Sequence, residues 1–152
     1  MKKIFYSLFA AALLLGAVSC SSDDNNSSVS ASEITATVTS GTWRITAFSE
    51  DGTDETNHFA GYNFTFAPTN VLTATNGTNN YQGIWSATSH DDSDDDNPGS
   101  DLDFNILFSS PDTFTELNED WEILERTSSR IKLRHVSGGN GGTDYLTFEK
   151  NS

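Results

Sequence analysis

The sequence predicts an all-β domain, an eight-stranded antiparallel up-and-down barrel with a short N-terminal helical segment. From residue 42 onward, short runs of Thr, aromatic and β-branched residues alternate between apolar and polar side chains, and turn residues separate the runs. Most links are short, so consecutive strands pair as a meander, and a meander that closes on itself leaves no exposed strand edge. A sandwich of two sheets would show the same alternation, but the order of the runs favours the barrel. The expected strands span residues 42–49, 62–67, 71–76, 83–89, 102–108, 121–126, 130–136 and 144–150.

Two segments combine helical and strand signals. The first holds Ser30 and Glu33 at capping-box spacing and Gly41 where a helix would stop, whereas its three threonines favour a strand. We predict a short helix there. The second segment, residues 114–124, carries apolar side chains at near-helical spacing. We expect at most one helical turn in it, followed by a strand from Trp121.

A basic start and an apolar run open the chain. Lys2 and Lys3 precede an apolar run that ends shortly before Cys20, the only cysteine. This order is that of a secretory signal peptide, and the run is short for a transmembrane helix, which needs about 20 apolar residues. We therefore predict that residues 1–19 are a signal peptide.

The sequence AVSC (17–20) resembles the lipobox of bacterial lipoproteins. The resemblance implies that Cys20 receives a diacylglycerol and becomes the mature N-terminus; an ordinary signal peptide before an unmodified cysteine is the alternative. Residues 20–32 are strongly polar and have little apolar surface to bury, so we expect them to form a flexible tether. In it, Asp23 and Asp24 resemble the acidic signal that directs lipoproteins of the Bacteroidota to the outer cell surface, although a plain solvated linker would look the same. The expected location is the outer membrane, lipid-anchored and exposed at the cell surface.

The charge of the chain excludes several partners. Without residues 1–19, six Lys and Arg remain against 22 Asp and Glu, a formal charge of −16. Nucleic acids and anionic lipid headgroups are recognised through Lys and Arg, so we expect neither as a partner, and the membrane is held only through the lipid anchor. Residues 33–152 suffice for one domain and not for two. We expect a monomer.

A three-residue motif opens the first strand. The sequence GTW, from Gly41 to Trp43, resembles the G-x-W motif of lipocalins, in which the Trp plugs the closed end of the barrel and a late Arg packs over it. The resemblance implies that Arg134, or else Arg130, is that partner. With the eight-strand layout, the domain resembles the small lipocalin-like lipoproteins of the Bacteroidota. It departs from lipocalins in its shorter length and in having no helix after the barrel.

The lipocalin-like layout implies a small apolar or amphipathic ligand inside the barrel. Inward-facing side chains would line that site, and Arg44 or His135 would orient the ligand. The candidate ligand-binding residues are Phe64, Phe66, Phe104, Ile106, Leu133 and His135.

Two other functions stay open. A barrel filled by its own side chains would serve as a structural or adhesive surface lipoprotein without a small-molecule ligand. Exposed aromatic residues such as Trp85 or Tyr81 would instead favour glycan binding. We expect no enzyme activity, because the sequence contains no G-x-S-x-G motif, no Cys–His pair and no Gly-rich phosphate loop.

The acidic segment 90–103 has alternating carboxylates. Asp92, Asp94 and Asp96 stand at the first, third and fifth positions of a calcium loop, and Asp103 stands at the twelfth. A Pro-Gly pair and the flanking strands depart from that pattern, so a solvated acidic hairpin loop and a weak calcium site are both open interpretations. No other cofactor is expected.

Lipidation at Cys20 can be tested by replacement with Ser, which removes the sulfur that carries the diacylglycerol. We expect Cys20→Ser to leave the membrane fraction or to accumulate as an unprocessed precursor, as followed by fractionation and immunoblotting. The neighbouring Ser21→Ala variant serves as the control and should stay in the membrane. Processed Cys20→Ser protein in the membrane fraction would rule out this role of the cysteine.

Overall fold

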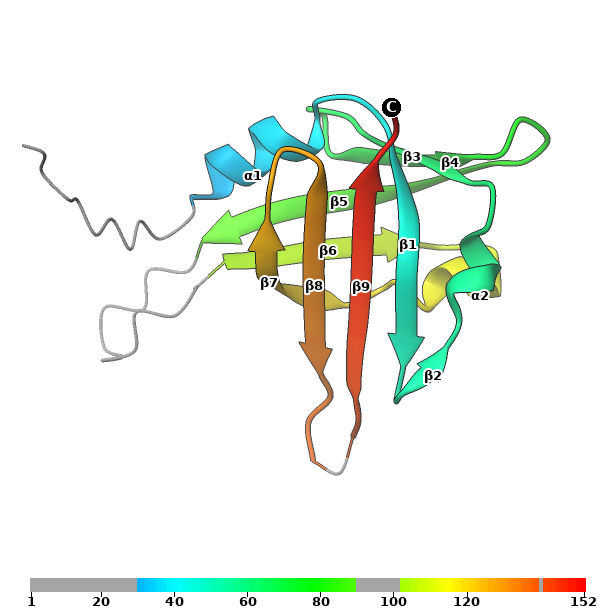
Figure 1. Ribbon diagram of the computed structural model, residues 1–152, viewed down its shortest axis with the longest axis vertical. Helices are drawn as coiled ribbons and strands as arrows, with labels where there is room; N and C mark the ends of the chain where they lie inside the picture. Colours follow the sequence, from blue (N-terminus) through cyan, green and yellow to red (C-terminus); the bar gives the residue numbers. More distant parts are fainter. Residues whose placement is uncertain (1–29, 90–101, 140) are drawn as a thin grey trace, which may run out of the picture.

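Nine strands and three short helices form the part of the chain that the computed structural model describes, residues 30–89, 102–139 and 141–152 (Figure 1). No helix in these residues is long and apolar enough to span a membrane. All eight predicted strands and the predicted N-terminal helix are present, with small shifts at their ends. The helical turn expected before the strand at Trp121 is also present. The elements are α1 (Ala31–Val38), β1 (Trp43–Glu50), β2 (Thr53–Asp54), the 3-10 helix η1 (Thr56–Phe59), β3 (Asn63–Phe66), β4 (Val71–Thr75), β5 (Asn80–Ser89), β6 (Leu102–Phe108), α2 (Asp112–Thr115), β7 (Asp120–Arg126), β8 (Arg130–Val136) and β9 (Thr143–Lys150).

Eight of the strands close into an antiparallel barrel. Neighbours pair in the order β1, β3, β4, β5, β6, β7, β8 and β9, and β9 pairs back with β1, where Trp43 lies opposite Lys150. The two-residue strand β2 pairs only with the last two residues of β1 and is not part of the ring. In Figure 1, β1, β8 and β9 run across the direction of β5 and β6, so the two halves of the ring cross. The predicted up-and-down barrel is confirmed.

A register shift sets which residues of β1 face inward. The sequence alternation places Ala47 on the same face as Trp43 and Ile45. In the structure, the pairing with β9 shifts between Ile45 and Ala47, which leaves Thr46 as an extra residue. The alternation therefore changes phase, so that Phe48 is buried and Ala47 is exposed.

The capping box predicted for the N-terminal helix is present. The Oγ atom of Ser30 accepts a hydrogen bond from the backbone N of Glu33 at 3.3 Å, and the Glu33 carboxylate accepts one from the backbone N of Ser30 at 2.9 Å. These bonds to the charged form hold the pKa of Glu33 below its usual value. The other face of α1 buries Ile34 and Val38 in the barrel core.

The threonines of α1 do not prevent the helix, because their hydroxyl groups have local acceptors. Thr35, Thr37 and Thr39 each donate a side-chain hydrogen bond to the carbonyl four residues earlier, at 2.7–2.8 Å. The hydroxyls are thus satisfied without leaving the helical conformation. Gly41, with φ of 90°, follows the helix end and leads the chain into β1.

Trp43 is buried beside α1, and its cationic neighbour is not the arginine that the G-x-W resemblance implies. The indole is fully buried and donates from Nε1 to the Val38 carbonyl at 2.8 Å, which joins α1 to β1. The Nζ atom of Lys150 lies 5.1 Å from the ring centroid. Arg134, the expected partner, follows the inward-facing Leu133 on β8, so it faces outward and forms an ion pair with Glu122.

Aromatic side chains fill the barrel interior. Ring pairs with centroids 5–6 Å apart, most of them edge-to-face or tilted, connect residues of β1, β3, β5 and β9 with each other or with η1, a geometry that adds to the stabilisation from burial alone. The largest fully buried side chains are Trp43, Trp121, Phe48, Phe59, Phe64, Phe66, Phe104, Phe108, Phe114 and Phe148.

Two of these phenylalanines come from outside the barrel strands. Phe59 belongs to η1 and Phe114 to α2, and their ring centroids are 5.3 Å apart. Phe114 also packs against Phe64, Phe108 and Tyr81. In Figure 1, α2 lies on the side of the barrel away from α1. The barrel is therefore closed by α1 on one side and by η1 with α2 on the other.

Truncating Trp43 tests how tightly the α1 side is packed. Trp43→Ala should lower the free energy of unfolding by about 3–5 kcal/mol, because it removes a fully buried ring and the bond to Val38. Urea unfolding followed by circular dichroism measures the change. Tyr145→Ala, at an exposed aromatic residue, is the control, and a loss as small as in this control would contradict the packing described here.

Candidate functional site

The predicted interior ligand residues belong to the packed core. Phe64, Phe66, Phe104, Ile106 and Leu133 are each no more than 2% exposed. Phe66 contacts Phe104 with ring centroids 5.7 Å apart, and Phe64 packs against Phe114 of α2. The structure thus brings these five positions together, but it fills the space between them with side chains.

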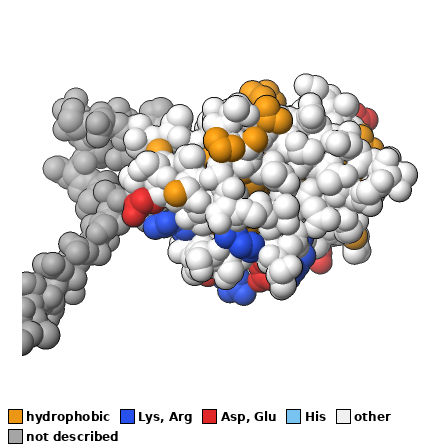
Figure 2. Space-filling model, turned by 90° about the horizontal axis from the view of Figure 1, so that it is seen from above, with side chains coloured by type: hydrophobic (Ala, Val, Ile, Leu, Met, Phe, Trp, Pro, Cys, Tyr) orange, Lys and Arg blue, Asp and Glu red, His pale blue; other side chains and the backbone are white. Residues whose placement is uncertain are grey.

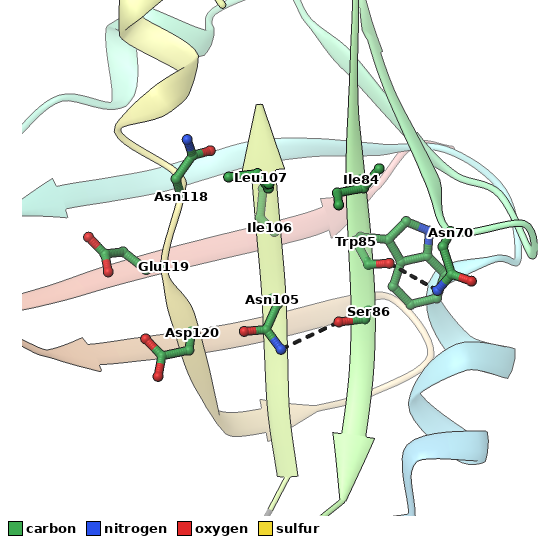
Figure 3. Close-up of a pocket in the computed structure, with 10 residues that line it drawn as sticks. All are labelled: Asn70, Ile84, Trp85, Ser86, Asn105, Ile106, Leu107, Asn118, Glu119 and Asp120. Atoms are coloured by element: carbon green, nitrogen blue, oxygen red, sulfur yellow. Dashed lines mark hydrogen bonds between the residues drawn. The ribbon is translucent and has the colours of Figure 1, made fainter. Parts of the chain in front are cut away.

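A groove lies on the outer face of the barrel, over β5 and β6 (Figure 3). Its floor holds a cross-strand pair, Ile84 opposite Leu107, and these side chains are 55% and 50% exposed. The next pair along the strands is Ser86 opposite Asn105. The hollow has a volume of about 620 Å³. It is lined by Asn70, Ile84, Trp85, Ser86, Asn105, Ile106, Leu107, Asn118, Glu119 and Asp120.

Hydrogen bonds hold the amide side chains around this groove. Asn70 donates to the Trp85 carbonyl at 3.0 Å. Asn118 accepts from the backbone N of Phe108 at 2.6 Å and donates to its carbonyl at 2.8 Å, which replaces a strand partner at the end of β6. These bonds orient two of the amide side chains that line the groove.

The outer surface of the barrel has a charged half and a nearly neutral half. All Lys and Arg side chains of the described residues lie on β1, β7, β8 and β9, and cross-strand ion pairs connect several of them, as between Arg130 and Glu149 or between Lys132 and Glu125. Strands β3, β4, β5 and β6 contain Asp103 as their one charged residue. Figure 2 shows the basic side chains on one side of the molecule and a hydrophobic patch on the other. The floor of the groove lies in the nearly neutral half, and one end of the groove reaches Asp120 of β7 at the border with the charged half.

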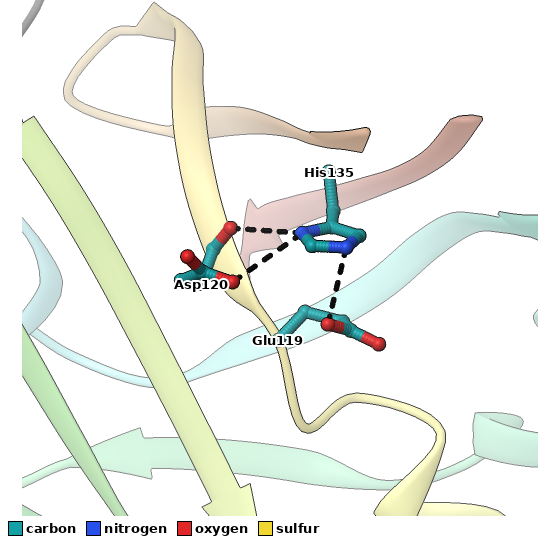
Figure 4. A group of neighbouring side chains, drawn as sticks. All are labelled: Glu119, Asp120 and His135. Atoms are coloured by element: carbon teal, nitrogen blue, oxygen red, sulfur yellow. Dashed lines mark hydrogen bonds and ion pairs between the residues drawn. The ribbon is translucent and has the colours of Figure 1, made fainter. Parts of the chain in front are cut away.

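Two carboxylates end the groove and contact a histidine of β8 (Figure 4). The Nε2 atom of His135 lies 3.3 Å from Glu119 Oε2, and its Nδ1 atom lies 3.1 Å from the Asp120 carbonyl and 3.5 Å from Asp120 Oδ1. The imidazole packs edge-on against the buried Trp121 and is 17% exposed. The alternation predicts that His135 shares the inward face of β8 with Leu133. In the structure it follows Ile131 and Leu133 on that face, but it lies at the edge of the core and is partly exposed.

A second histidine also lies between carboxylates. His58 of η1 contacts Glu116 through Nδ1 at 2.9 Å and Glu55 through Nε2 at 3.1 Å. The hydrogen bond to Glu116 raises the pKa of His58 above its ordinary value. Nearby, burial raises the pKa of the Glu50 carboxyl, and the charge of Glu116 adds to this effect. Acidic groups therefore crowd this side of the barrel, and His58 compensates part of their charge.

Several predicted residues lie outside the described part or away from the groove. Cys20, Asp92, Asp94 and Asp96 fall outside the described residues. Asp103 is in β6, opposite Glu122 of β7. Trp85 is 3% exposed, and Tyr81 packs against Tyr62 and Phe114, so neither is a flat exposed aromatic surface of the kind expected for glycan binding.

The sequence reading missed the groove. Its signal was present, because Ile84 and Leu107 are aliphatic residues next to the inward-facing Trp85, Ile106 and Phe108. Alternation assigns such neighbours to the outer face, where a large apolar side chain is unusual in a strand with one buried face.

Comparison with known proteins adds no function. The sequence matches no known protein family and no curated protein. Among solved structures, it is similar to the crystal structure of a DUF4847 family protein from Bacteroides vulgatus, with a TM-score of 0.48 and 19% sequence identity. The similarity covers 78% of this chain and 97% of that one. A similarity of this degree assigns the chain to no family.

The His58 contacts predict a pH dependence of stability. Because the pKa of His58 is raised in the folded state, its contribution is complete below its ordinary pKa near 6.5 and is lost as the pH rises through the raised value. The free energy of unfolding should therefore fall from about pH 6 to about pH 8, and His58→Gln should flatten that decline. Urea titrations at each pH measure it. Glu116→Gln should act in the same direction, and an unchanged slope in both variants would contradict the assignment.

Proposed function

We propose that this protein is a non-enzymatic lipoprotein of the cell envelope that binds a small amphipathic molecule in the outer groove over β5 and β6. The observation that carries the proposal is the groove itself, in which a half-exposed apolar pair, Ile84 and Leu107, meets the carboxylates of Glu119 and Asp120. The anchor at Cys20 and the exposed location are part of this proposal and are supported by the N-terminal sequence alone.

The groove has the size and chemistry of a small-molecule site. Its volume of about 620 Å³ lies within the range of about 300–1,000 Å³ common for such sites. Aliphatic side chains on the floor suit an apolar moiety, while Ser86 and Asn105 offer hydrogen-bonding groups beside it. The carboxylates at one end favour a ligand with an ammonium or hydroxyl group there. An amphipathic amine combines these features.

The interior is a poorer candidate. A ligand between Phe64, Phe66 and Phe104 would have to displace side chains that are already in contact, and protein interiors resist the insertion of even small groups. The filled interior agrees with the alternative in which side chains occupy the barrel. The outer groove offers a different place for the amphipathic ligand that the first hypothesis put inside the barrel.

A matched pair of fluorescent probes tests the groove. The probes are a naphthyl-labelled alkylamine and the carboxylate of the same length, titrated into the full chain in the presence of EDTA. We expect saturable binding, tighter for the amine, and a loss of about tenfold or more in Leu107→Ser because the apolar floor is removed. Asp120→Asn should reduce the preference for the amine while leaving the apolar contribution in place.

Leu124→Ser is the matched control for Leu107→Ser. Leu124 is 47% exposed on β7 and does not line the groove, whereas Leu107 is 50% exposed within it. Equal losses in the two variants would indicate nonspecific adsorption to exposed leucines. Absence of saturable binding by either probe would leave a structural or adhesive surface lipoprotein as the better assignment.

A further inference from the structure

We propose that His135, Glu119 and Asp120 form a binding site for a divalent transition-metal ion of the Zn²⁺ class. One ligand atom from each residue lies within 4.8 Å of the other two. Glu119 and Asp120 also end the groove, so a metal ion and the ammonium group of the proposed ligand would compete for them. The two proposals are tested apart, since the probe titration contains EDTA and the Zn²⁺ titration contains no probe.

The surroundings of His135 indicate which ring nitrogen is available to a metal. Nδ1 faces the Asp120 carbonyl at 3.1 Å, and a carbonyl only accepts hydrogen bonds. In the neutral imidazole, Nδ1 therefore carries the hydrogen, and Nε2 carries the lone pair. Histidines that bind metals commonly donate their other N–H to a carbonyl or carboxylate in this way, because the bond fixes the tautomer and the ring orientation.

The spacing of the two nearest ligand atoms fits a metal ion. The lone pair of Nε2 faces the Glu119 carboxylate across 3.3 Å. A cation between these two atoms satisfies both of them, and that cation is either a proton or a metal ion. In a tetrahedral zinc site with bonds of about 2.1 Å, neighbouring ligand atoms lie about 3.4 Å apart, close to the distance found here.

The remaining coordination positions have donors and room. The Asp120 side chain is 69% exposed, so its carboxylate can turn toward the same ion. Glu119 and Asp120 also line the groove, and its hollow leaves space for water ligands. Nitrogen and carboxylate donors suit Zn²⁺ and neighbouring transition metals, whereas Ca²⁺ requires six to eight oxygen atoms.

His58 provides a contrast within the same molecule. Each of its ring nitrogens faces a carboxylate, Glu116 at Nδ1 and Glu55 at Nε2. A doubly protonated ring satisfies both neighbours by donating to each, so this cluster is complete with a proton. At His135, Nδ1 faces the Asp120 backbone carbonyl at 3.1 Å, with the Asp120 carboxylate at 3.5 Å, and Nε2 faces Glu119. The two histidines therefore have similar carboxylate neighbours and differ in the backbone carbonyl that fixes the tautomer of His135.

Titration of the full chain with ZnCl₂, followed by calorimetry, tests the site. We expect a binding event whose affinity falls about tenfold or more in His135→Gln and in Glu119→Gln and is kept in the matched variant His58→Gln. If His135→Gln does not fold, as judged by circular dichroism, Glu119→Gln carries the comparison. CaCl₂ titrated in the same way should not displace the Zn²⁺.

Long-range ¹H–¹⁵N spectra of the histidine side chains give a second readout. On addition of Zn²⁺, the Nε2 resonance of His135 should shift while Nδ1 remains protonated. The proposal is overturned if Zn²⁺ does not bind, if the affinity is equal in wild type, His135→Gln and Glu119→Gln, or if the shifted resonance belongs to another histidine. A proton, and not a metal, would then join His135 to Glu119.

Discussion

The filling of an eight-stranded ring with aromatic side chains is the constraint on which the rest of this structure depends. A ring of eight strands encloses a space just wide enough for side chains, and here the inward positions of every barrel strand contribute large apolar groups. The strands alone do not complete the filling. Phe59 and Phe114, which come from short helical turns between strands, enter the core and contact residues of several strands. The helices are thus part of the core and not attachments to it.

A filled interior leaves the outward-facing positions to interact with other molecules. On β1, β7, β8 and β9 these positions carry ion pairs whose side chains are about one-quarter to one-half exposed, and such pairs contribute little to stability. Their effect is to keep the basic groups of an acidic protein occupied by neighbouring carboxylates. On β3 to β6 the outward residues are mostly Thr, Asn, Gln and Ser, and the apolar pair Ile84 and Leu107 lies among them. Low charge and partial apolar character are the surface properties that favour binding of an uncharged or amphipathic group.

Most of the fold could be predicted from the sequence because patterns within single segments indicate most of its strands and its N-terminal helix. Alternation over seven or eight residues marked β6, β8 and β9, and the capping box marked α1 despite its threonines. Local patterns could not give the bulge in β1, which places Phe48 in the core in place of Ala47, or the inward position of Phe59 and Phe114. Both depend on contacts with strands distant in the sequence.

The candidate site was less predictable for the same reason. His135 meets Glu119 and Asp120 only because β7 and β8 are paired, and no ligand spacing along the chain shows it. Lys150 takes the place expected for Arg134 over Trp43 because β9, and not β8, is the strand paired with β1. The only sign of the groove in the sequence is that Ile84 and Leu107 are apolar, although the alternation assigns their positions to the solvent face.

The pairing of β1 with β9 also has a consequence for how the chain acquires its structure during synthesis. A protein made from its N-terminus exposes β1 long before β9, and about a hundred residues separate the paired positions Arg44 and Glu149. Until β9 has emerged, β1 has no strand on that side, and the core residue Phe148, which packs against Phe64 and Phe66, is missing. The ring therefore cannot assemble progressively, strand by strand, into a stable intermediate with a closed core. Closure is therefore a late event that involves the whole domain and waits for the last barrel strand.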